Sequence, residues 1–139
     1  MTASAQYTLT ATTSLPFAEA VAATRQALAD EGFGVLSEID VQATLKAKLD
    51  EDVEPYLILG ACSPRDAHQA LAAEPELGAL LPCNVVVYAR DGETHLAAID
   101  PVVMLGLVEN PAVEPIAGAI RERLERAVSA AGAATTEVA

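Results

Sequence analysis

Apolar and polar residues follow two spacings along this chain, and the first of them is typical of strands. Alternating or short continuous apolar runs occupy five segments, namely 7–12, 33–39, Tyr56–Cys62, Cys83–Arg90 and 93–100. Asp91-Gly92, between the last two, is the strongest hairpin signal in the chain. The pattern predicts a mainly antiparallel sheet of five strands.

Spacings of three and four residues predict the helices. They cover 15–30, 41–49, a segment from Ser63-Pro64 to Pro75, and a long helix after Asn110-Pro111 that includes residues 113–128. Residues 75–80 and 102–108 are expected to form short turns or helices. Ser14, Asp40, Ser63 and Asn110 are expected helix caps, Gly32 a left-handed helix end, and Glu122–Arg126 an ion pair within the last helix.

These elements define an α+β fold class, a five-stranded mainly antiparallel sheet with helices on one face. Residues 57–59 and 85–87 are apolar at consecutive positions, so both faces of the central strands need cover. The helices can cover one face, and a second copy of the chain is the simplest cover for the other. The sequence therefore predicts a homodimer.

Length and composition indicate one domain over residues 1–139, with an ordered core of about 6–129 and a frayed tail from Ala130. Eight basic residues stand against 20 acidic ones, for a net charge of −12. Because a nucleic-acid binder needs clustered Lys or Arg, this charge argues against nucleic acid as a partner. No apolar run is long enough to cross a membrane, and residues 1–6 contain no secretory signal, so we expect a cytoplasmic protein with reduced thiols.

Four ordered motifs carry a family resemblance. They are Gly32-Phe-Gly-Val with Glu38-Ile-Asp40, Lys46-Ala-Lys-Leu49, Ile58-Leu-Gly-Ala-Cys-Ser-Pro64 and Leu80-Leu-Pro-Cys-Asn-Val-Val-Val87. From about Tyr7 to Leu124 the chain resembles the bacterial and archaeal family called domain of unknown function 302.

The resemblance implies a small fold similar to the TATA-binding-protein-like β-α-β(4)-α arrangement, with an extra helix here between strands three and four. It also implies a tendency to dimerise, and some relatives hint at sulfur metabolism. It brings no catalytic residues, and DNA binding does not follow from the fold.

The two cysteines form the candidate site. Cys62 ends the third strand and Cys83 begins the fourth, so antiparallel pairing of these strands brings both to one edge of the sheet. A helix that starts at Ser63-Pro64 is expected to lower the pKa of the Cys62 thiol. His68 on that helix and Asn84 complete the candidate ligand-binding set of Cys62, Cys83, His68 and Asn84.

Several functions remain open at this stage. The first is a dimeric module that binds a small molecule or sulfur species at the cysteine end; the second is a thiol-dependent enzyme or sulfur carrier with Cys62 as nucleophile and Cys83 as resolving thiol. A structural interaction protein without a ligand is the third. Buried cysteine most often serves as a small apolar residue. A soft-metal site would need His95 or Asp100 besides His68, and we expect neither metal nor cofactor.

Overall fold

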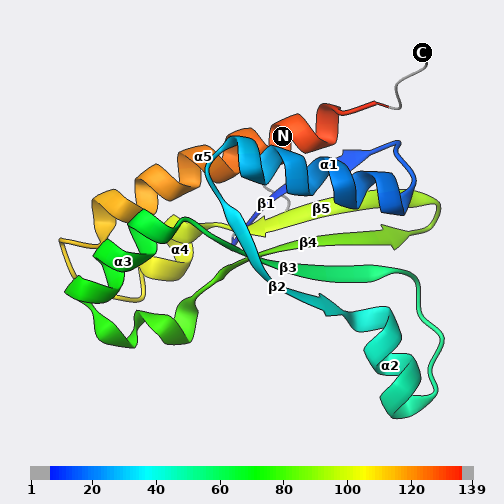
Figure 1. Cartoon of the computed structure of the whole chain (residues 1–139), viewed down its shortest axis with the longest axis horizontal. Helices are drawn as coiled ribbons and strands as arrows, with labels where there is room; N and C mark the ends of the chain where they lie inside the picture. Colours follow the sequence, from blue (N-terminus) through cyan, green and yellow to red (C-terminus); the bar gives the residue numbers. More distant parts are fainter. Residues whose placement is uncertain (1–6, 136–139) are drawn as a thin grey trace.

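The computed structural model describes residues 7–135 (Figure 1). The strands are β1 (Thr8–Thr13), β2 (Gly34–Asp40), β3 (Tyr56–Cys62), β4 (Cys83–Arg90) and β5 (Glu93–Ile99). The helices are α1 (Phe17–Asp30), α2 (Val41–Leu49), α3 (Pro64–Ala73), the 3-10 helix η1 (Pro75–Leu80), α4 (Pro101–Leu105) and α5 (Glu114–Ala133). Over the described residues, the predicted α+β fold with an extra helix between the third and fourth strands is confirmed.

All neighbouring strands run antiparallel, in the order β1-β5-β4-β3-β2. The β4–β5 hairpin turns at Asp91 and Gly92, which have φ values of 51° and 82°. Two consecutive positive φ values match the twist of a tight hairpin, so this prediction is confirmed. The order makes β2 and β1 the edge strands and places β5 one strand inside the sheet.

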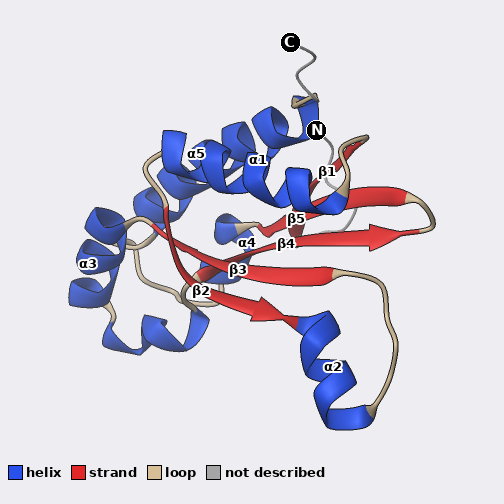
Figure 2. Ribbon diagram, turned by 45° about the vertical axis from the view of Figure 1, so that its right-hand side comes forward, coloured by secondary structure: helices blue, strands red, loops and turns tan. Residues whose placement is uncertain are grey.

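One face of the sheet carries the main core. Helices α1 and α5 lie across this face in both views (Figures 1 and 2). Alternation along the strands turns Leu59 of β3, Val85 of β4 and Leu96 of β5 toward them, and each side chain is buried. Leu28 of α1 and Leu124 of α5 complete a core made of aliphatic side chains, in accord with the scarcity of aromatic residues.

The opposite face, called the open face below, is not covered by α1 or α5. Figure 2 shows α2 at one end of it, below the end of β2. Side chains of the alternate strand positions, such as Ile58, Val86 and Ala97, are only half-buried there. As predicted, α1 and α5 cover one face of the sheet and leave the other face without their cover.

Two predicted helix caps are wrong. Helix α1 starts at Phe17 after Pro16, not after Ser14, because Thr13 forms a local turn in which its hydroxyl accepts a hydrogen bond from the Leu15 amide at 3.1 Å. Helix α5 starts at Glu114, since Asn110 caps a preceding turn through the Ala112 amide at 3.0 Å. The other predicted caps hold their positions. The Asp40 carboxylate accepts from the Ala43 amide and Ser63 precedes α3.

The end of α5 differs from expectation in two ways. Arg126 pairs with Glu31 at 3.0 Å instead of with Glu122, because the turn after α1 packs beside this helix. The helix also continues past residue 129 to Ala133, since Ala131 is buried against the body of the protein. The part of the predicted tail at 136–139 lies outside the described residues, as does the predicted absence of a signal in residues 1–6.

Candidate functional site

A groove of about 650 Å³ runs over the open face. Its floor is formed by alternate residues of four strands and its rim by α2 and the segment that follows it. The lining residues are Tyr7, Thr8, Thr10, Val41, Leu45, Val53, Glu54, Tyr56, Asn84, Val86, Tyr88, Ala89, Arg90, Ala97 and Ile99. This volume is within the range of small-molecule sites.

The strand register explains why these residues meet. Ile58 of β3 lies opposite Val86 of β4, which lies opposite Ala97 of β5. Small and β-branched side chains therefore occupy the middle of the open face, where they leave room above the sheet. Two positions further along each strand, on the same face of the sheet, Tyr56 lies opposite Tyr88, and Tyr88 lies opposite His95.

Tyr56, Tyr88 and His95 form a stack of three rings across the open face. The Tyr56 and Tyr88 ring centroids are 5.3 Å apart with planes 20° from parallel, and those of Tyr88 and His95 are 4.9 Å and 14° apart. His95 is half-buried, because β1 pairs outside β5 and makes β5 an inner strand. The stack fixes two of the groove's tyrosines, since each ring restricts its neighbour.

The groove carries one acid and one base, Glu54 and Arg90. Neither forms an ion pair or a side-chain hydrogen bond with another of the described residues. Nearby on α2, Lys46 is neutralised by Asp50 at 2.9 Å and Asp52 at 3.1 Å. Arg90 is therefore the unpaired basic side chain among the described residues that line the groove.

The cysteine end of the sheet has a different geometry. The residue opposite Cys83 is Ala61, so Cys62 is offset by one position along β3. Because side chains alternate along a strand, the position of Cys62 is on the opposite face of the sheet from that of Cys83. Even so, both cysteines line a cavity of about 20 Å³, together with Phe33, Ser63 and Asp66 among others. That volume suffices for about one water molecule, not for an organic ligand.

Both thiols are held in the protonated form. Burial raises the pKa of the Cys62 thiol, and the Asp66 carboxylate adds to this effect. Burial raises the pKa of Cys83 to about 11, with a further contribution from Cys62. The expectation that the start of α3 lowers the pKa of Cys62 is therefore wrong in sign, because desolvation and a nearby acid outweigh the helix end.

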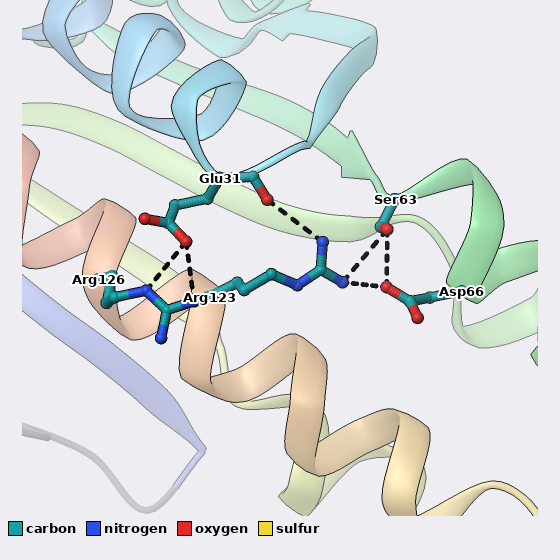
Figure 3. A network of polar contacts seen from close by, with 5 residues as sticks. All are labelled: Glu31, Ser63, Asp66, Arg123 and Arg126. Carbon is teal, nitrogen blue, oxygen red and sulfur yellow. Dashed lines mark hydrogen bonds and ion pairs between the residues drawn. The ribbon is translucent and has the colours of Figure 1, made fainter.

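A cluster of polar side chains closes this end of the molecule (Figure 3). The Arg123 guanidinium on α5 pairs with Asp66 on α3, donates to the Ser63 hydroxyl and to the Glu31 carbonyl at 3.2 Å each, and lies 5.0 Å from the centre of the Phe33 ring. Ser63 in turn donates to Asp66 at 2.7 Å. Because these groups bond to one another, the cluster joins α5, α3 and the α1–β2 turn.

The four predicted site residues separate into three places. Cys62 and Cys83 share the small cavity, His68 is exposed on α3 and lines neither cavity, and Asn84 lies on the open face and lines the groove. Among residues 7–135, no three or more His, Cys, Asp or Glu side chains are placed to hold a metal ion. In the same range no helix has the length and hydropathy of a membrane span.

Sequence reasoning missed the groove, although one signal was present. The chain contains three tyrosines and no tryptophan, and all three tyrosines, Tyr7, Tyr56 and Tyr88, line the groove. In a chain with 4% aromatic residues, tyrosines on alternating strand positions indicate a wet or ligand-facing surface.

The fold and groove define a class, an α+β protein with one sheet face under helices and a groove on the other. The chain belongs to the DUF302 family, described as domain of unknown function DUF302, which it matches over residues 8–131. It is similar to the solved structure of an uncharacterized conserved DUF302 protein from Bacillus stearothermophilus. That protein is 31% identical, with a TM-score of 0.85, and the match covers 91% of this chain and 99% of that one. No curated protein matches the chain.

Proposed function

We propose that this protein is a small-molecule-binding module that holds its ligand in the open-face groove and works as a homodimer. The observation that carries the proposal is the groove itself. It combines a volume of about 650 Å³ with a largely apolar lining and a small number of polar groups, Asn84, Glu54 and Arg90 among them. Sites that bind organic molecules have this composition.

Binding accounts for the groove better than catalysis does. Among the described residues, its lining contains no cysteine, histidine, serine or lysine, and its one carboxylate, Glu54, stands at the rim. Cysteine, histidine, serine and lysine supply most of the nucleophiles and general bases in enzymes. The ligand is therefore held and released unchanged in this proposal.

Three features weigh against a thiol-dependent function. Cys83 is 4% exposed, the cavity beside the two thiols has a volume of about 20 Å³, and burial favours their protonated forms. A nucleophilic or sulfur-carrying cysteine needs a thiolate and access to its substrate. The sulfur-species role and the cytoplasmic location expected from the sequence remain predictions.

Dimerisation is supported by apolar side chains on β2 and α2 that do not line the groove. Leu36, Ile39 and Leu49 are between 51% and 68% exposed. Ile39 lies opposite Ile58 and so belongs to the open face. A second copy that covers this corner would remove the three side chains from water and leave the groove at the edge of the contact.

The dimer is tested by sedimentation equilibrium at micromolar concentration. The wild type is expected at twice the mass of 14.4 kDa, and Ile39→Lys at the monomer mass. Leu107→Lys is the matched control, because Leu107 is 76% exposed after α4 and far from β2 in sequence. A monomeric wild type contradicts the dimer without touching the groove.

Ligand binding is tested with phenylnaphthylamine, a neutral planar dye. Because the chain has no tryptophan and its three tyrosines line the groove, bound dye should quench tyrosine emission by energy transfer. Loss of a stacked ring in Tyr88→Leu is expected to weaken binding about fivefold. Cys62→Ala is the control and should bind as the wild type does; the reverse ranking of the two variants contradicts the proposal.

A further inference from the structure

We infer that the ligand of the groove is a planar aromatic molecule with a single acidic group, which binds the Arg90 guanidinium while the ring packs against Tyr56 and Tyr88. The inference rests on the proposed function and adds the chemical class of the ligand. It follows from the state of the basic residues, the spacing along β4 and the shape of the lining.

The state of the basic residues singles out Arg90. Of the eight, all within the described range, five form ion pairs: Arg25, Lys46, Arg121, Arg123 and Arg126. Lys48, Arg65 and Arg90 do not, and of these only Arg90 lines the groove. With 20 acidic residues in the chain, an unpaired guanidinium at the groove is available for an anion that the protein does not itself supply.

The spacing along β4 places this charge beside the ring stack. Arg90 follows Tyr88 by two residues, so the two side chains leave the same face of the strand about 7 Å apart. The end of β4 is held to the segment after α2, since the Ala89 amide donates to the Pro55 carbonyl at 3.0 Å. Tyr56 and His95 take the two faces of the Tyr88 ring, so a ligand ring would pack against its edge. A ring in that position brings an attached carboxylate or sulfonate within reach of Arg90.

The lining selects a flat, apolar ligand body. Val41 and Leu45 of α2, with Val53, form an aliphatic rim, and Val86 and Ala97 form a shallow floor. Stacked tyrosines add rigid aromatic surface, which favours a ring over a flexible chain. The arrangement can bury the ring of a ligand and leave its charged group at the rim.

Glu54 limits the ligand to one acidic group. Its carboxylate lies on the same groove as Arg90, in a protein of net charge −12, so a second negative charge on the ligand would meet repulsion without a second cation. Polyphosphates are therefore disfavoured. A guanidinium bound to one carboxylate or sulfonate gives a charge-assisted hydrogen bond, with geometric specificity.

A pair of dyes separates the charge from the ring. Anilinonaphthalene sulfonate is an aromatic anion with a flat naphthalene ring, and phenylnaphthylamine has the same rings without the sulfonate. The wild type is expected to bind the anion about tenfold more tightly, as a charged hydrogen bond allows. Arg90→Gln should abolish this preference by lowering the affinity for the anion about tenfold relative to that for the neutral dye. Arg65→Gln, which changes an exposed unpaired arginine outside the groove, should keep it.

Thermal unfolding of each variant verifies that the native fold is what binds the dyes. If both dyes bind equally and Arg90→Gln changes neither affinity, the inference is overturned while the proposed function stands. If Arg90→Gln lowers the affinity for both dyes to the same degree, Arg90 maintains the structure of the groove and does not recognise the anionic group. The inference is then likewise overturned. If neither dye binds the folded protein, the proposed function fails as well.

Discussion

The two ends of strand β3 differ in what they offer to a ligand. At Cys62 the side chains close on one another: the cavity there holds about 20 Å³, the thiols are protonated, and Arg123 satisfies Ser63 and Asp66. At Tyr56 the sheet opens into a groove of about 650 Å³ with an unpaired arginine. Groups that satisfy each other stabilise a fold, whereas groups left without protein partners are available for binding.

The largest expected effect concerns the closed end. Arg123→Ala removes the partner of Asp66, whose side chain is 20% exposed, and leaves that carboxylate with the Ser63 hydroxyl alone. Breaking such a pair costs about 3 kcal/mol, discounted toward 2 kcal/mol for partial exposure. Urea denaturation measures the loss.

Arg126→Ala is the control for this prediction. Arg126 pairs with Glu31 but is 58% exposed, so its loss should cost less than about 1 kcal/mol. Neither variant should change dye affinity. Equal costs for the two variants, or a loss of dye binding in Arg123→Ala, would mean that the two ends are not separate.

The second effect is a pH dependence that originates at Cys83. Because its folded pKa is raised to about 11 from 9.0, the folded state keeps the proton after the unfolded chain has lost it. This thiol therefore makes its full contribution to the free energy of unfolding below pH 9. The contribution falls by about 2 kcal/mol as the pH rises toward 11. Across this pH range, the free energy of unfolding should change less with pH in Cys83→Ala than in the wild type.

Cys62→Ala serves as the comparison, since Cys62 is more exposed and should account for less of the slope. Alkylation by iodoacetamide at pH 7.5 adds a direct test of the thiol alternative. Both native thiols should react more slowly than a free cysteine peptide. Rapid modification of native Cys62 would revive the nucleophile that the sequence suggested.

The smallest effect concerns the rim of the groove. Asp40 caps α2 through the Ala43 amide at 2.9 Å, and loss of such a cap costs about 1 kcal/mol of helix stability. Val41 and Leu45 of α2 line the groove, so part of the lost helix stability should appear as lost binding energy. Asp40→Ala should therefore weaken phenylnaphthylamine binding about threefold. Glu76→Ala, which removes an exposed acid on η1 away from the groove, should bind as the wild type does; equal weakening in both would refute a role for α2.

The elements of the fold were predictable because each depends on neighbours in sequence. Asp91-Gly92 fixed the hairpin, Gly32 adopts the predicted left-handed conformation at a φ of 85°, and Asp40 caps α2 as expected. The helix starts at Ser14 and Asn110 were wrong since local turns at Thr13 and Asn110 use the same donors and acceptors that a cap would use.

The site was less predictable because it depends on strand order and register. Antiparallel pairing of β3 and β4 was enough to bring Cys62 and Cys83 to one edge of the sheet, as predicted; the small cavity that both line was not predicted. The position of β1 outside β5, which makes β5 an inner strand and leaves His95 half-buried, is not encoded in any local pattern. Burial, which sets the direction of both thiol pKa values, likewise follows only from the assembled fold.

Chemical-shift mapping with anilinonaphthalene sulfonate tests the central claim most directly. We predict that the changes concentrate on Tyr56, Val86, Tyr88 and Ala97 and leave the amides of Ala61 and Ala67 beside the cysteines unmoved. Changes at Ala61 and Ala67, with the tyrosines unaffected, would contradict the account and return the site to the cysteine end.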